Sequence, residues 1–136
     1  MNALTSSAQA ARDAARMVAA GEPLKHVWRY AVLQALDDYS SVLRHDGIAA
    51  AAQWWAEEPR TTGDPRVDAA FAALAEHLAR RDGWTVPSWA RDPSRETTRW
   101  WFVSDLAGQH PRALVESPLS FRKRGVFITS DALVRA

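Results

Sequence analysis

The chain has 136 residues, of which 47% are apolar and 24% are charged, and its net charge is +1 at pH 7. This length fits one domain with its own core, and the composition excludes an intrinsically disordered protein. The near-zero net charge argues against a molecule that attracts nucleic acid over its whole surface. We therefore expect a single folded domain spanning residues 1–136.

The chain contains no cysteine, which excludes a disulfide framework and a thiolate metal site. Arg12, Asp13 and Arg16 interrupt the Ala-rich N-terminus, so we expect neither a signal peptide nor a membrane span there. These features predict a soluble, cytoplasmic protein that does not interact with membranes. The strongest departure from average composition is the presence of seven tryptophans.

Four principal helices are predicted in the first 83 residues. Serine and threonine at positions 5–7 can cap the first helix, which ends near Gly21. The side chains at its inward positions are small, so this N-terminal helix (residues 1–20) either packs closely on a neighbouring segment or is loosely attached. The second helix starts near Pro23 and ends at Gly47. Its apolar stripe recurs every three to four residues and consists of Trp28, Val32, Leu36, Tyr39 and Leu43.

The third and fourth predicted helices are marked by composition and by capping residues. An Ala-rich segment predicts a short helix at residues 48–56. The Asp-Pro pair at 64–65 is a strong helix start, and Gly83 can close the fourth helix. Glu76 and Arg80 lie one turn apart in this helix and can form an ion pair. Its predicted apolar face consists of Val67, Ala70, Phe71, Leu74 and Leu78.

Irregular structure is predicted after Gly83, because the helical periodicity is lost there. We first expect a short helix after residues 92–93 that carries Trp100 and Trp101, and then a helix near 111–116. A turn capped at 117–118 and closed by Gly125 should follow. The last elements are an extended segment at 126–128 and a final helix at 131–135 that is capped by Ser130. The predicted fold class is all-α or nearly so. We expect a helical bundle with an irregular, Trp-rich C-terminal part and one short strand.

No catalytic or metal-binding motif is present in the sequence. The four histidines are widely spaced, the glycines are scattered singly, and no GxSxG or phosphate-binding pattern occurs. We therefore predict no metal, no cofactor and no catalytic residue, and we expect a protein that is not an enzyme. A site assembled from residues distant in sequence stays open, since such sites depend on geometry.

The tryptophans are the main candidates for a partner-binding surface, because this residue type is enriched at interaction hot spots. The alternative is that their rings fill the core between Ala-rich helices. Adjacent rings on a helix cannot both point inward, so at least one ring of each adjacent pair is expected at an edge. The candidate partner-binding residues are Trp54, Trp55, Trp84, Trp89, Trp100 and Trp101.

A basic cluster near the C-terminus is a second candidate contact region. Its members are Arg112, Arg122, Lys123 and Arg124. They could contact phosphates or an acidic protein partner. The alternative is a solvated helix end, where cations favour the negative pole of the helix dipole.

Two stretches carry a family resemblance: TGDPRVDAAFAALAEHLARRDGWTVPSWA (62–90) and WWFVSDL…HPRALVESPLSFRKRGVFI (100–128). They resemble a poorly characterised actinobacterial domain found in hypothetical, helix-turn-helix-associated and putative antitoxin proteins. The resemblance implies a regulatory protein that associates with a partner, and it supplies no catalytic residues. This chain has no recognisable helix-turn-helix, so the resemblance leaves neutralisation of a partner as the expected role.

The sequence thus predicts a non-enzymatic, protein-binding accessory or regulatory protein, of the kind that an antitoxin represents. Its expected partner is a cognate toxin or regulator. One alternative is a nucleic-acid-binding regulator that uses the basic cluster or a partner. Another is a small-molecule binder or unrecognised enzyme with a Trp-lined pocket.

Overall fold

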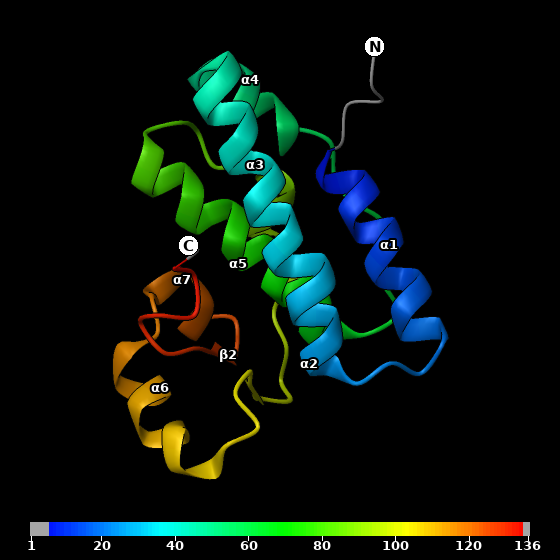
Figure 1. The fold of residues 1–136 in the computed structure, drawn as a ribbon, viewed down its shortest axis with the longest axis vertical. Helices are drawn as coiled ribbons and strands as arrows, with labels where there is room; N and C mark the ends of the chain where they lie inside the picture. Colours follow the sequence, from blue (N-terminus) through cyan, green and yellow to red (C-terminus); the bar gives the residue numbers. More distant parts are fainter. Residues whose placement is uncertain (1–5, 135–136) are drawn as a thin grey trace.

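A computed structural model describes residues 6–134 of the chain. Most of these residues are helical, and the strands form a single two-stranded parallel sheet (Figure 1). The predicted fold class, all-α or nearly so, is confirmed. The α-helices are α1 (Ser7–Ala19), α2 (Leu24–Val27), α3 (Leu33–Asp46), α4 (Ile48–Trp54), α5 (Pro65–Asp82), α6 (His110–Glu116) and α7 (Leu119–Arg122), and the strands are β1 (Trp101–Phe102) and β2 (Val126–Phe127).

The N-terminal part folds as the capping residues and apolar spacing predict. The Ser6 hydroxyl accepts a hydrogen bond from the Gln9 N–H at the start of α1, and Ala11 and Ala14 are buried. Helix α2, a π-helical turn η1 (Trp28–Val32) and α3 follow one another without a break. The predicted stripe is buried from Trp28 to Tyr39, and its last member is partly buried.

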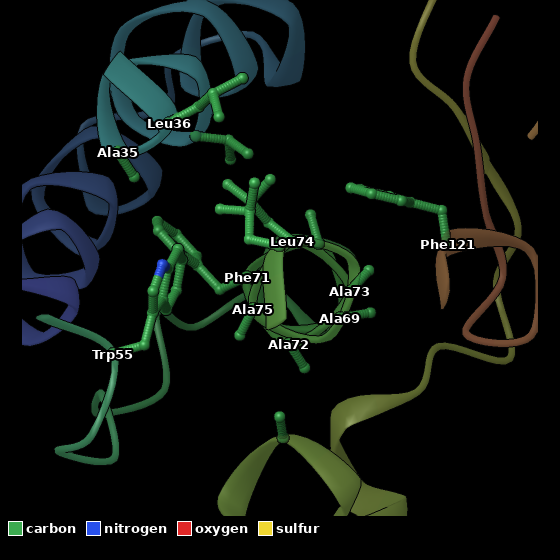
Figure 2. Close-up of a cluster of buried hydrophobic side chains, with 14 of the residues drawn as sticks. Ala35, Leu36, Trp55, Ala69, Phe71, Ala72, Ala73, Leu74, Ala75 and Phe121 are labelled. Carbon is green, nitrogen blue, oxygen red and sulfur yellow. The ribbon is translucent and has the colours of Figure 1, made fainter. Parts of the chain in front are cut away.

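Helix α5 is the central element of the core. The Asp64 carboxylate accepts the Arg66 N–H at 2.9 Å at its start, and Gly83 ends it with φ +86°. The predicted apolar face is buried, but so are the alanines on the other faces of this helix. Figure 2 shows α5 end on, with Leu36 of α3 and Trp55 on one side and Phe121 on the other. Small alanine side chains let neighbouring segments approach α5 from all around its axis.

The C-terminal part gathers at one end of the molecule, where β2, α6 and α7 lie below α5 in Figure 1. Strand β1 pairs with β2 in register Trp101↔Val126. The close approach of this region depends on Gly125, whose φ is +84°. A Cβ atom on Gly125 would lie 2.5 Å from the Thr97 carbonyl oxygen, so this position requires glycine.

Two predicted C-terminal helices are wrong. Residues 92–93 begin a short 3₁₀ turn, η3 (Pro93–Arg95), and the chain then bends at 96, 98 and 99 before entering β1, so that Trp101 lies in a strand and not in a helix. Pairing with β2 satisfies backbone N–H and C=O groups that would otherwise form hydrogen bonds within a helix. Residues 131–133 form hydrogen-bonded turns, not the expected helix, and residue 135 lies outside the described residues.

Between residues 6 and 134, no helix is both long enough and apolar enough to cross a bilayer.

Candidate functional site

The first Trp pair lies in the core. Trp54 and Trp55 are both buried, and their ring centroids are 5.0 Å apart. The expectation that one ring of this pair lies at an edge is therefore wrong. Helix α4 ends at Trp54, so Trp55 departs from the helical path and its ring packs towards α5 (Figure 2). The helix boundary between the two residues lets both rings point inward.

Trp89 is also buried, and its side chain connects the loop after α5 to the Trp55 backbone by a hydrogen bond. Its indole Nε1 donates to the Trp55 carbonyl oxygen at 2.9 Å, and the two rings are 6.2 Å apart. The Trp55 Nε1 itself is buried and finds no acceptor among the residues that the structure describes. Trp54 and Trp55 are 5% and 0% exposed, and Trp89, at 6%, keeps a small part of its surface on a groove beside Trp84.

Trp84 is partly buried and belongs to a hydrogen-bonded chain at the end of α5. Its Nε1 donates to the Tyr39 hydroxyl at 2.8 Å, and that hydroxyl donates to the Asp82 carboxylate at 2.7 Å. Burial and the hydrogen bond to Asp82 raise the pKa of Tyr39 to about 12. One face of Trp84 nevertheless remains accessible, because it lines a surface groove.

That groove has a volume of about 830 Å³ and runs between α4 and residues 84–91. Its walls are mostly apolar and include Trp84, Val86 and the alanines of α4. Arg91 is the only charged side chain among the described residues that line it. The groove therefore offers apolar packing and one cation, and its lining supplies no carboxylate or imidazole for acid–base chemistry.

The second Trp pair divides between core and surface. Trp101 is buried edge-on against Trp28, whereas Trp100 is 61% exposed. Successive residues of an extended strand point to opposite faces, so only one ring can enter the core. The expectation of one edge ring is confirmed for this pair, although a strand and not a helix produces it. The Trp100 ring leans on Phe127 with 4.8 Å between centroids.

The four basic residues do not form one surface patch. Arg124 is buried, and its Nη1 donates to the Glu76 carboxylate at 2.7 Å. Lys123 also binds Glu76, at 2.8 Å, while Arg112 pairs with Glu116 on the surface. Arg122 is exposed. The structure therefore assigns Arg124 to an internal ion cluster, whereas Arg112, Arg122 and Lys123 keep exposed side chains.

Glu76 is the centre of this ion cluster. Burial acts to raise its pKa, but hydrogen bonds from Lys123, Arg124 and Arg80 outweigh burial and lower the pKa to about 2. The predicted pair between Glu76 and Arg80 is present, with an N–O distance of 2.7 Å. The cluster joins α5 to α7 and holds the C-terminal part in place.

Exposed apolar side chains, which the sequence reasoning missed, are concentrated in the C-terminal part. Eight large apolar residues are exposed among the described residues, and six of them lie between positions 100 and 134. We call these six the C-terminal apolar surface: Trp100, Leu106, Leu114, Val115, Leu119 and Val134. Val115 is the most exposed, at 79%. Large contiguous apolar patches on soluble proteins mark interaction sites, whereas apolar side chains that are exposed singly are ordinary.

Local geometry brings several members of this surface together. Ala113 takes the buried position of the short helix α6, which leaves the adjacent Leu114 and Val115 directed outward. The turn that precedes Val134 is held against α6, because the Ser130 N–H donates to the Glu116 carboxylate at 2.9 Å. The neighbouring pair 114–115 was a usable sequence signal, since two adjacent side chains cannot share one buried helix face.

In the part of the chain that the structure describes, no group of three or more histidine, aspartate or glutamate side chains could hold a metal ion.

Comparisons of the chain with protein-family models, curated proteins and solved structures returned no match. The resemblance to the actinobacterial antitoxin-like domain therefore stays a prediction.

Proposed function

We propose that this protein is a non-enzymatic accessory or regulatory protein that binds a protein partner through the C-terminal apolar surface. The observation that supports the proposal is the concentration of exposed apolar side chains between residues 100 and 134. Covering one such Leu or Val side chain contributes roughly 1–2 kcal/mol, so a few of them supply a useful binding energy. A protein partner provides the apolar surface that this requires.

The polar surroundings fit the edge of a protein interface. Arg112 and Arg122 are exposed near α6 and α7, where they can contact carboxylates of an acidic partner at the rim. Among the tryptophans, Trp100 is the proposed anchor, because it combines a large ring with high exposure. Trp84 is partly accessible and remains a secondary candidate.

The resemblance to putative antitoxin proteins supports a more specific form of this proposal. In that form the partner is a cognate toxin or regulator, and binding neutralises it. The absence of cysteine fits a cytoplasmic site of action. The chain would then contact nucleic acid only through its partner.

Co-purification of the tagged chain from its host, at low and high salt, tests the proposal. We expect a stoichiometric protein partner that is retained at high salt, because apolar burial is not screened by ions. Val115→Glu and Leu119→Glu should each reduce the recovered partner at least tenfold. The matched control is Tyr30→Glu, since Tyr30 is exposed on η1 and belongs neither to this surface nor to the lining of the groove beside Trp84.

The same experiment distinguishes the alternatives. Nucleic acid that is recovered at low salt and lost at high salt would favour a nucleic-acid-binding regulator. If no macromolecule is recovered, the groove beside Trp84 becomes the better candidate for a small-molecule binder. Either result, or full recovery of partner with Val115→Glu and Leu119→Glu, would contradict the proposed surface.

A further inference from the structure

The groove beside Trp84 has one wall of small apolar side chains. Helix α4 contributes Ile48, Ala49 and Ala52, which lie about one turn apart on one face of the helix. Alanine methyl groups leave space in front of this face that longer side chains would have filled. Ile48 is 51% exposed, and within residues 6–134 only Tyr30 is a second exposed large apolar residue outside the C-terminal apolar surface. The groove therefore presents apolar surface that shares no residue with the C-terminal apolar surface.

The opposite wall consists of indole rings whose N–H groups are turned towards the protein. The Trp84 Nε1 donates to the Tyr39 hydroxyl at 2.8 Å, and this bond fixes the ring at the groove. The Trp89 Nε1 donates to the Trp55 carbonyl oxygen at 2.9 Å. A ligand in the groove therefore meets the carbon atoms of both indoles. Because Trp89 is only 6% exposed, the partly exposed Trp84 supplies most of the surface on which a flat ring can stack.

Arg91 brings a positive charge to this apolar groove and has no counter-charge there. It is exposed and lies at the end of the 3₁₀ turn η2 (Ser88–Arg91). Arg66 and Arg95 each form a salt bridge with a carboxylate, whereas no residue between positions 6 and 134 forms one with Arg91. The guanidinium is therefore available to an anionic group of a ligand.

We propose that this groove is a binding site for a small aromatic carboxylate. The ring would lie between Trp84 and the alanines of α4, and the carboxylate would accept two parallel hydrogen bonds from the Arg91 guanidinium. The charge identifies the class of ligand, because Arg91 repels a cation and a neutral ring leaves Arg91 without a partner. The volume of about 830 Å³ is in the range of small-molecule sites. The inference goes beyond the proposed function and does not depend on it.

NMR titration of the full chain with 2-naphthoate tests the site. We expect a Kd on the order of 0.1–1 mM for a ligand of this size. The Trp84 indole N–H resonance should shift, and the ring protons of the ligand should show nuclear Overhauser effects to the methyl groups of Ala49 and Ala52. The neutral analogue 2-naphthamide has the same ring and should bind about fivefold more weakly, because it lacks the charge.

Three variants separate the contribution of the charge from that of the apolar walls. Arg91→Met removes the charge and keeps an apolar stem, so it should weaken 2-naphthoate about fivefold and leave 2-naphthamide unchanged. The matched control is Arg122→Met, since Arg122 is an exposed cation on α7 outside the groove, and it should change neither affinity. Ala49→Leu fills the position of the ring and should abolish the Overhauser effects with both ligands. Ala49 is exposed, so this variant keeps the fold.

The outcomes separate this inference from the proposed function. The inference is overturned if millimolar 2-naphthoate shifts no groove resonance, if 2-naphthamide binds as tightly, or if Arg91→Met weakens both ligands equally. It is also overturned if Ala49→Leu abolishes recovery of a host protein partner or disrupts a dimer of the chain, since a protein surface would then occupy the groove. If 2-naphthoate binds as described but no partner is recovered, the groove site stands and the proposed surface is wrong. If Val115→Glu abolishes partner recovery while 2-naphthoate does not bind, only the groove site is wrong.

Discussion

The Arg124 guanidinium lies 2.7 Å from the Glu76 carboxylate, and both side chains are almost fully buried, at 3% and 2% exposure. The same guanidinium donates to the Ser120 and Ala90 carbonyl oxygens, at 2.8 and 2.7 Å. One arginine thus connects α5, the loop after it and α7. A buried cation with a full set of acceptors is stable only while its carboxylate partner is present.

Removal of that carboxylate should destabilise the protein strongly. Glu76→Gln leaves Arg124 buried without a counter-charge, and we expect the free energy of unfolding to fall by about 3–5 kcal/mol. Urea unfolding followed by circular dichroism measures the change. Glu116→Gln is the control, because its ion pair with Arg112 is on the surface, and its effect should be far smaller. Equal losses of unfolding free energy in the two variants would show that the buried pair stabilises the fold no more than the surface pair does.

Stability should also depend on pH through Glu76. The folded protein holds the pKa of Glu76 at about 2, below the ordinary value of 4.5 that the unfolded chain restores. A lowered folded pKa means that the carboxylate stabilises the fold fully above about pH 5 and progressively less as the pH falls towards 2. The free energy of unfolding of the wild type should therefore drop more steeply between pH 5 and pH 2 than that of Glu76→Gln. Parallel curves for the two proteins would contradict the ion cluster.

Gly125 and Gly83 provide a matched test of the sheet region. Both have φ near +85°, so alanine should cost about 1–2 kcal/mol at either position for the left-handed conformation. Only at Gly125 does the added Cβ meet backbone, at 2.5 Å from the Thr97 carbonyl oxygen. Gly125→Ala should therefore cost a further 1–3 kcal/mol, about the penalty of overpacking. Equal unfolding energies for the two variants would mean that residues 97 and 125 do not approach so closely.

Fluorescence quenching tests the exposure of Trp100. Among the tryptophans only Trp100 is mainly exposed, so Trp100→Phe should remove most of the emission that acrylamide quenches readily. The free energy of unfolding should change by no more than about 0.5 kcal/mol, as expected for a surface position. Trp101→Phe is the comparison, and it should leave the quenching almost unchanged while lowering stability. Undiminished quenching in Trp100→Phe would place that ring in the core.

The helices before Gly83 could be predicted because their signals are local. Asp64 caps α5, Gly83 ends it, and the apolar stripe from Trp28 follows one helix face. Strand β1 could not be predicted in this way, since Trp101 is extended only through its pairing with Val126, 25 positions later in the chain. The aromatic and β-branched residues at 100–103 favour a strand, but they do not indicate which distant segment the strand pairs with.

The candidate site was only partly predictable for a related reason. Tryptophan is favoured both in protein cores and at interfaces, so residue type alone does not distinguish the exposed Trp100 from the buried Trp55. The difference in exposure depends on where α4 ends and on the alternating directions of side chains along β1. Apart from the pair 114–115, the aliphatic members of the C-terminal apolar surface carry no periodic signal, because Leu106 and Val134 lie outside any helix or strand and Leu119 lies in the four-residue helix α7.

The enclosure of α5 has a consequence for how the protein opens. Segments that precede α5, such as α3, and segments that follow it, such as α7, cover different sides of the same alanine-rich helix. If either group separates, methyl groups of α5 become exposed to water and the core that both groups share is opened. The two parts of the chain should therefore unfold as one cooperative unit. The amides of α5 would then exchange with solvent only when the whole molecule unfolds.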